Sequence, residues 1–197
     1  MTAAKTIYKK NIEDVSILTS IYDYLRPNVA AFDISELLRS EYVLCISALD
    51  RYVHHRVREG LVNAFHDITM DPGNTRISLK IVRLLLNEND LIERERILDA
   101  ELQNILSRDS YQSPTSIESA FCLINVNKIW SKISPGFGKP ADDIKNELAL
   151  IINRRNKIAH ESDVNFATGL KEYIDRPMLQ DTKYFINKLV DELEYLT

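Results

Sequence analysis

Two residues with the chemistry needed to cleave RNA lie near the end of one helical stretch of the chain. Arg155 and His160 are separated by four residues. An imidazole can take the proton of a ribose 2′-hydroxyl or protonate a leaving oxygen. A guanidinium can hold a pentavalent phosphate, because its N–H donors form a fixed fork. The pair is therefore a candidate site for phosphodiester cleavage.

Arg155 also interrupts an apolar pattern. At about 100° per residue, one side of the helix carries an apolar stripe, which comprises Ile144, Leu148, Ile151, Ile152, Ile158 and Ala159. Arg155 falls inside this stripe, where an aliphatic residue is expected. A cation on a core-facing surface costs stability unless it has a partner or a function. The position of Arg155 therefore requires an explanation.

A second row of small, uncharged residues runs beside the stripe. It contains Ala149, Asn153, Asn156 and His160, at steps of four, three and four. This row predicts a polar seam along which a second subunit or an RNA strand could lie. Arg155 and His160 are about 140° apart on an ideal helix and do not stack. We therefore expect either a local distortion of the helix or an Arg155 side chain that swings toward His160.

A purely structural explanation for Arg155 is an ion pair with a buried acid. Asp50 is the candidate, because it interrupts the apolar row Val43, Ile46, Val53 and Val57 of an earlier helix. An acid in such a row either leaves the core at its rim or pairs with a buried cation. Under this alternative, Asp50 and Arg155 stabilise the fold and do no chemistry.

The composition predicts that these residues are carried by helices. Only five Gly and six Pro occur in 197 residues, whereas strand-and-turn folds use more of both. Apolar periodicity predicts helices over 11–26, 33–65, 75–87, 90–108, 115–133 and 144–161, and a last one after Pro177. Thr115 and Glu118 match a capping box, and the cluster 66–74 predicts a turn. We expect one all-α domain over 1–197, a bundle of six or seven helices.

Several function classes are excluded by missing motifs. The chain contains no Gly-x-Ser-x-Gly, Gly-x-Gly-x-x-Gly or Gly-x-x-x-x-Gly-Lys-Ser/Thr sequence, so the common hydrolase, dinucleotide and NTPase sites are not expected. We expect no cofactor. Apart from the adjacent His54 and His55, no Cys or His pair has ligand spacing, so no metal site is predicted. A net charge of −4 excludes a surface that coats nucleic acid by charge alone.

The chain has the features of a cytoplasmic protein. Its first residues lack the apolar run of a signal peptide, and no stretch reaches the roughly 18 apolar residues of a membrane span. Cys45 and Cys122 each lie in apolar sequence. We interpret both as buried free thiols in a reducing compartment.

Two segments resemble a known family. The segment from Arg155 to His160 resembles the Arg-x(4–6)-His motif of HEPN domains, in which a polar residue such as Asn156 commonly follows the Arg. The segment 36–54, with Ala48-Leu49-Asp50-Arg51-Tyr52 inside it, resembles the Ala-Leu-Asp-x-Tyr helix of the RiboL-PSP branch of that superfamily. The two segments occur in the expected order and separation.

The resemblance implies a helical domain that often dimerises. In active members two such motifs face each other across a cleft and cut RNA without a metal, leaving a cyclic phosphate end. On this chain the resemblance implies that His160 is the acid/base and Arg155 stabilises the phosphate, while Asn156 orients His160 or contacts RNA. Asn153, which shares the polar row with Asn156, is a further candidate for binding or orienting the substrate. Arg154 also satisfies the spacing. We favour Arg155, because Asn156 follows it and because Arg154 projects from the apolar stripe.

The resulting hypothesis is a metal-independent, homodimeric endoribonuclease. Members of this superfamily commonly act in toxin–antitoxin, abortive-infection or other phage-defence systems, so RNA and an antitoxin or defence-system protein are the expected partners. The alternative is a non-catalytic HEPN module that binds RNA, a nucleotide or a protein. HEPN toxins that are neutralised by AMPylation carry a Tyr two residues after the His. Ser162 occupies that position here, so this form of control is not expected.

Overall fold

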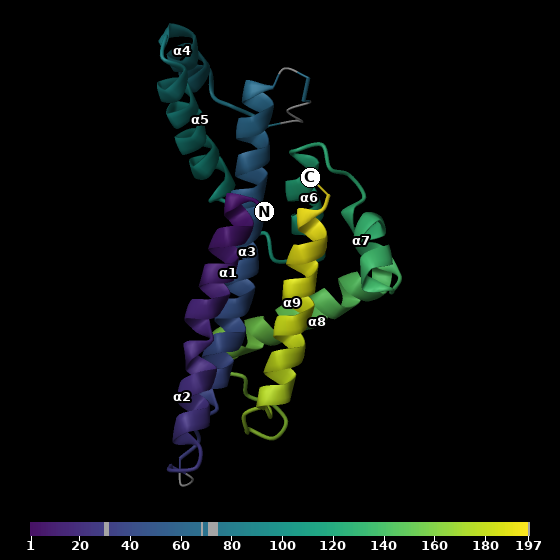
Figure 1. The fold of residues 1–197 in the computed structure, drawn as a ribbon. Helices are drawn as coiled ribbons and strands as arrows, with labels where there is room; N and C mark the ends of the chain where they lie inside the picture. The colour runs from purple at the N-terminus through teal and green to yellow at the C-terminus, as the bar shows by residue number, and fades with distance from the viewer. Residues whose placement is uncertain (30–31, 68, 71–74, 197) are drawn as a thin grey trace.

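The fold is built from helices alone. The computed structural model of the chain describes residues 1–29, 32–67, 69–70 and 75–196 (Figure 1). These residues contain nine helices, and their only extended pairing is the isolated antiparallel bridge between Val164 and Lys171. The predicted all-α fold class is confirmed. None of the described helices is both long and apolar enough to cross a membrane.

A single long helix, α3 (Glu36–His66), forms the centre of the molecule. Its 31 residues correspond to roughly 46 Å of helix. Helices α1 (Ala3–Val15) and α2 (Ile17–Leu25) lie along it, and α9 (Arg176–Glu194) packs beside it (Figure 1). The predicted helix 33–65 therefore corresponds closely to α3, and all other layers are arranged around it.

The predicted helix 11–26 is in fact two helices. The break falls at Ser16, whose Oγ donates to the carbonyl oxygen of Ile12 at 2.7 Å and accepts from Nζ of Lys183 at 2.7 Å. One backbone N–H in the first turn of α2 has its partner outside the helix. Glu41 of α3 is fully buried and accepts from the backbone N–H of Thr19 at 2.8 Å. The break depends on long-range partners, which periodicity cannot detect.

The second half of the chain begins with α4 (Leu79–Asn87) and α5 (Leu91–Leu106), and continues with α6 (Pro114–Cys122), α7 (Ile129–Phe137) and α8 (Ala141–Glu161). The predicted helix 115–133 is divided because Asn125 and Lys128 adopt left-handed backbone angles, with φ of 60° and 56°. The bundle therefore has nine described helices in place of the predicted six or seven.

The capping box of α6 is formed by Ser113 and Ser116, with Pro114 at the first helical position, and not by Thr115 and Glu118. Of the predicted turn at 66–74, residues 68 and 71–74 lie outside the described residues.

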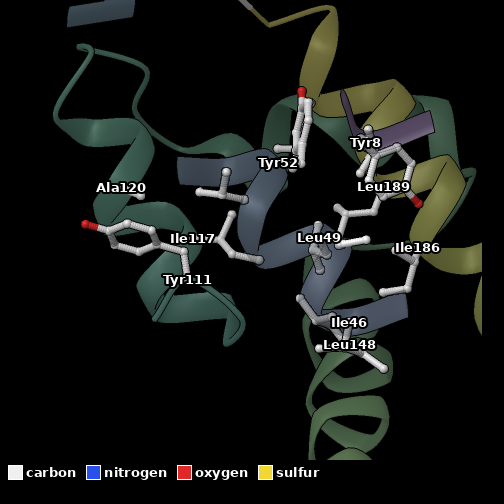
Figure 2. Packing of buried hydrophobic residues seen from close by; sticks show 14 of the residues in the cluster. Tyr8, Ile46, Leu49, Tyr52, Tyr111, Ile117, Ala120, Leu148, Ile186 and Leu189 are labelled. Carbon is white, nitrogen blue, oxygen red and sulfur yellow. The ribbon is translucent and has the colours of Figure 1, made fainter. Parts of the chain in front are cut away.

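The core lies between α3 and the helices that cover it (Figure 2). Ile46, Leu49 and Tyr52 of α3 meet side chains of α1, α6, α8 and α9, which include Tyr8, Ile117, Leu148, Ile186 and Leu189. Each fully buried aliphatic side chain contributes about 1.5–3 kcal/mol. This packing fixes α8 against α3, and α8 carries the candidate site.

The two cysteines differ. Cys45 is fully buried in α3, as predicted, and burial raises the pKa of its thiol to about 12. Cys122 is exposed, so its predicted burial is wrong. It is the last residue of α6, where the apolar face of that short helix ends.

Candidate functional site

The inner face of α8 is anchored on α3. Ile144 and Leu148 are fully buried and Ile151 is 9% exposed, so the first half of the predicted apolar stripe is confirmed. Tyr42 of α3 donates its hydroxyl to the carbonyl oxygen of Ile151 at 3.2 Å. Burial raises the pKa of Tyr42, so the phenol keeps the proton that it donates. The position of α8 just before its last two turns is therefore fixed against α3.

The stripe does not stay buried to the end of α8. Ile152 and Ile158 are only half-buried, and Ala159 is exposed. The core ends before the helix does, so the final turns of α8 face solvent along most of their circumference. The predicted place of Ala159 on the core side is wrong.

The second row of α8 is open to solvent. Ala149, Asn153, Asn156 and His160 are all exposed. His160 lies in the last turn, and it forms no hydrogen bond or ion pair with any described residue. An imidazole in this position can be reached by a ligand from solvent.

Arg155 lies between these two faces. Its side chain is half-buried, and its Nη1 donates to Oδ1 of Asn156 at 3.1 Å. Its Nε is buried and has no hydrogen-bond partner among the described residues. Asn156 therefore orients Arg155, whereas the sequence pointed to His160. Its Nη2 forms no hydrogen bond with a described residue and is the donor left for an anion.

Asp50 does not pair with Arg155. Its Oδ1 accepts from the backbone N–H of Tyr111, and its Oδ2 lies 3.7 Å from Nε2 of His54. Asp50 thus leaves the core at its rim and holds the segment that precedes α6 against α3. The suggested buried pair between residues 50 and 155 is not found among the described contacts.

The arginine with a buried acidic partner is Arg154. Its Nη2 donates to Oδ2 of Asp163 at 2.7 Å and to the carbonyl oxygen of Tyr173 at 3.0 Å. Arg154, which the sequence places off the apolar stripe, is half-buried and turned toward this acid. The guanidinium of Arg154 is held by these structural contacts. Arg155 is therefore the arginine of the pair with unused donors.

Asp163 connects α8 to α3 and was not identified from the sequence. The residue is 1% exposed, and the same Oδ2 accepts from Nε of Arg39 at 2.9 Å. Its backbone N–H donates to the carbonyl oxygen of Lys157 at 3.0 Å. Ser162 and Asp163 have φ of 53° and 58°, so the chain turns sharply after α8 and brings the carboxylate inward. The sequence offers little signal for this, since Arg39 lies 124 positions away.

The predicted distortion of α8 is not found. The helix is α-helical from Ala141 to Glu161, and Arg155 is engaged with its neighbour Asn156. No hydrogen bond joins Arg155 to His160 within the described chain. One copy therefore presents a free imidazole and a partly free guanidinium on different sides of the same helix end.

The described residues contain no group of three or more His, Cys, Asp or Glu side chains that could hold a metal ion. The chemistry that the exposed end of α8 can supply is proton transfer at His160 and binding of an anion at Arg155.

Comparison with known proteins identifies one family. A family model described as RiboL-PSP-HEPN matches residues 9–195, which is almost the whole chain. No curated protein and no solved structure matches the chain at a significant level.

Proposed function

Because the chain belongs to the RiboL-PSP-HEPN family, we propose that it is a metal-independent endoribonuclease that works as a homodimer. The family indicates a ribonuclease or an RNA-binding function. The observation that favours cleavage is that two adjacent arginines form different contacts. Arg154 is held by Asp163, whereas Arg155 bonds only to Asn156 and the exposed His160 bonds to no described residue.

In the proposed reaction, His160 takes the proton of a ribose 2′-hydroxyl. The 2′-oxygen forms a bond to the adjacent phosphorus, and the bond from phosphorus to the 5′-oxygen of the next nucleotide breaks. The protonated His160 of a second copy gives its proton to the departing 5′-oxygen and becomes neutral, so that the products are a 2′,3′-cyclic phosphate and a 5′-hydroxyl. Arg155 stabilises the extra negative charge on the pentavalent phosphate.

The outer face of α8 supports the homodimer. Leu150 is 70% exposed and stands beside the row that contains Ala149 and Asn153. An apolar side chain next to small, uncharged residues allows two helices to approach closely. Two copies that meet on this face would bring two Arg155/His160 motifs together. Such an arrangement removes the need for contact between Arg155 and His160 within one chain.

The test is cleavage of a labelled RNA by purified protein in excess EDTA. We expect the wild type to cleave and to leave cyclic phosphate ends. Both Arg155→Ala and His160→Ala should lower the rate by about 100-fold or more. Lys157→Ala is the matched control, because it removes an exposed cation between the two residues.

Three outcomes contradict the proposal: full cleavage by either variant, loss of wild-type cleavage on chelation, or an inert wild type. An inert wild type that binds RNA, a nucleotide or a protein would identify the non-catalytic alternative.

We extend the proposal to a cytoplasmic role in a toxin–antitoxin or phage-defence system, in which a partner protein restrains the nuclease. Its support is the family alone. Induced expression of the wild type should then arrest growth of the host cell, whereas His160→Ala should not. Equal growth arrest by both would contradict this role.

A further inference from the structure

A cavity of about 590 Å³ lies at the opposite half of α3 from the contact with α8. The first residues of α1, the last turns of α3 and the segment after α6 form its walls. Arg56 lines it and lies 14 positions after Tyr42 in α3, or roughly 21 Å along the helix. The volume is within the range of small-molecule sites, about 300–1,000 Å³.

Arg56 is a buried cation that forms no ion pair with any described residue. The residue is only 5% exposed, and its Nε is buried with no hydrogen-bond partner among the described residues. Buried arginines are ordinarily paired, because an uncompensated charge in the interior is strongly destabilising. Such a residue on the wall of a cavity either binds a ligand there or lowers the free energy of unfolding.

The nearby carboxylates are engaged elsewhere. Oε1 of Glu59 accepts from the backbone N–H of Ala4 at 2.9 Å. Glu194 accepts from the backbone N–H of Thr2 at 2.8 Å and from the hydroxyl of Tyr52 at 3.2 Å. Neither acid forms an ion pair with Arg56 in the described part of the chain.

The N-terminal end of α1 borders the same cavity. Thr2 is the N-cap of α1, a helix of 13 residues, and both Thr2 and Ala3 line the cavity. The N–H groups at this end are already bonded within the protein, because that of Ala4 donates to Glu59 and that of Lys5 donates to Oγ1 of Thr2. Arg56 is therefore the group on the cavity wall that can receive an anion.

The other walls set the character of the ligand. Met70, Ile124 and Val126 are apolar, and they face a cavity that also holds Glu59. One carboxylate on the wall favours a ligand of low charge over a polyphosphate. The apolar walls favour a hydrocarbon body over a bare inorganic ion.

We infer that the cavity between α1 and α3 binds a small organic monocarboxylate, with its carboxylate on Arg56 and its apolar body against Met70, Ile124 and Val126. This site is separate from the end of α8 and does not depend on the proposed ribonuclease activity. Without the bound anion, the buried charge of Arg56 lowers the stability of the protein.

The probe is hexanoate, titrated into the full chain by calorimetry in a buffer free of other carboxylates. We expect saturable binding to the wild type. Binding should be at least about tenfold weaker for hexanol, which lacks the charge, and for inorganic phosphate, which lacks the apolar body. Arg56→Met should weaken hexanoate binding at least about tenfold and, without ligand, should raise the melting temperature.

Arg58→Met is the control. Arg58 lies two positions further on the same helix, outside this cavity, and pairs with Asp99 at 3.0 Å. It should bind hexanoate like the wild type. Arg56→Lys keeps the charge, and it should retain binding if the methionine variant does not fold. Absence of saturable hexanoate binding to the wild type, equal binding by Arg56→Met, or tighter binding of phosphate than of hexanoate overturns the inference.

Discussion

The two sides of the end of α8 carry similar residues that differ in their contacts within the protein. On the inner side, Arg154 and Arg39 both donate to Asp163, at 2.7 and 2.9 Å, and this carboxylate is 1% exposed. On the outer side, Arg155 holds only Asn156 and His160 is exposed without a partner among the described residues. The charged groups of the inner side pair with one another through Oδ2 of Asp163, while its Oδ1 is buried without a hydrogen-bond partner among the described residues. On the outer side, neither Arg155 nor His160 pairs with an acid among the described residues.

This difference separates structure from function within one helical turn. A buried carboxylate with two charged donors fixes the geometry of the turn that follows α8, and breaking it leaves buried charge behind. Side chains with unused donors at the surface add little to stability and remain available for a ligand. Adjacent arginines can therefore have different roles, and the distinction can be tested by substitution.

The largest effect is expected on the inner side. Asp163→Asn keeps the shape of the side chain and tolerates a φ of 58°, but it removes the charge that Arg39 and Arg154 share. We expect the free energy of unfolding to fall by about 3 kcal/mol or more, measured by urea denaturation. Glu161→Gln, an exposed acid two positions earlier, should change it by less than about 0.5 kcal/mol. Equal effects of the two substitutions would show that the inner side is not a structural contact.

The second-largest effect is expected from a substitution on the outer side of α8. Leu150→Asp places a charge on the exposed face that we assign to dimerisation, where Leu150 is 70% exposed. The variant should run as a monomer in size-exclusion chromatography with light scattering. It should also lose RNA cleavage by about 100-fold, while the monomeric chain still unfolds in one cooperative transition. A monomeric variant with full cleavage would exclude a site composed of two copies.

The smallest effect concerns the turn between the two sides. Ser162 is exposed and adopts a φ of 53°, a conformation that glycine reaches without steric strain. Ser162→Gly should therefore stabilise the protein by about 0.5–1 kcal/mol, measured by thermal unfolding. Destabilisation would mean that the Ser162 side chain contributes to the turn and that the contrast between the two sides is less sharp.

Local periodicity predicted much of this arrangement. The positions of Ile144, Leu148 and Ile151 follow from a repeat of 3.6 residues, and so does the exposure of the row with Asn153 and His160. The long central helix was also predicted to within a few residues at each end. In each case the pattern that supports the prediction lies within a single helix.

The remaining features depend on contacts that are distant in sequence. Which arginine turns inward is decided by Asp163, whose second donor, Arg39, is 124 positions away. The break at Ser16 depends on Lys183, and the position of Asp50 depends on Tyr111. Arg56 showed no anomaly in the sequence, because its significance comes from the cavity that it lines.

The most direct test of the account compares Arg154→Ala with Arg155→Ala in one preparation, by urea denaturation and by RNA cleavage in EDTA. Arg154→Ala should lower the free energy of unfolding by about 1.5–3 kcal/mol and, where it remains folded, should keep cleavage within about tenfold of the wild type. Arg155→Ala should leave unfolding within about 0.5 kcal/mol and lower cleavage by about 100-fold or more. The reverse pattern, in which Arg155 supports the fold and Arg154 supports cleavage, would contradict the account.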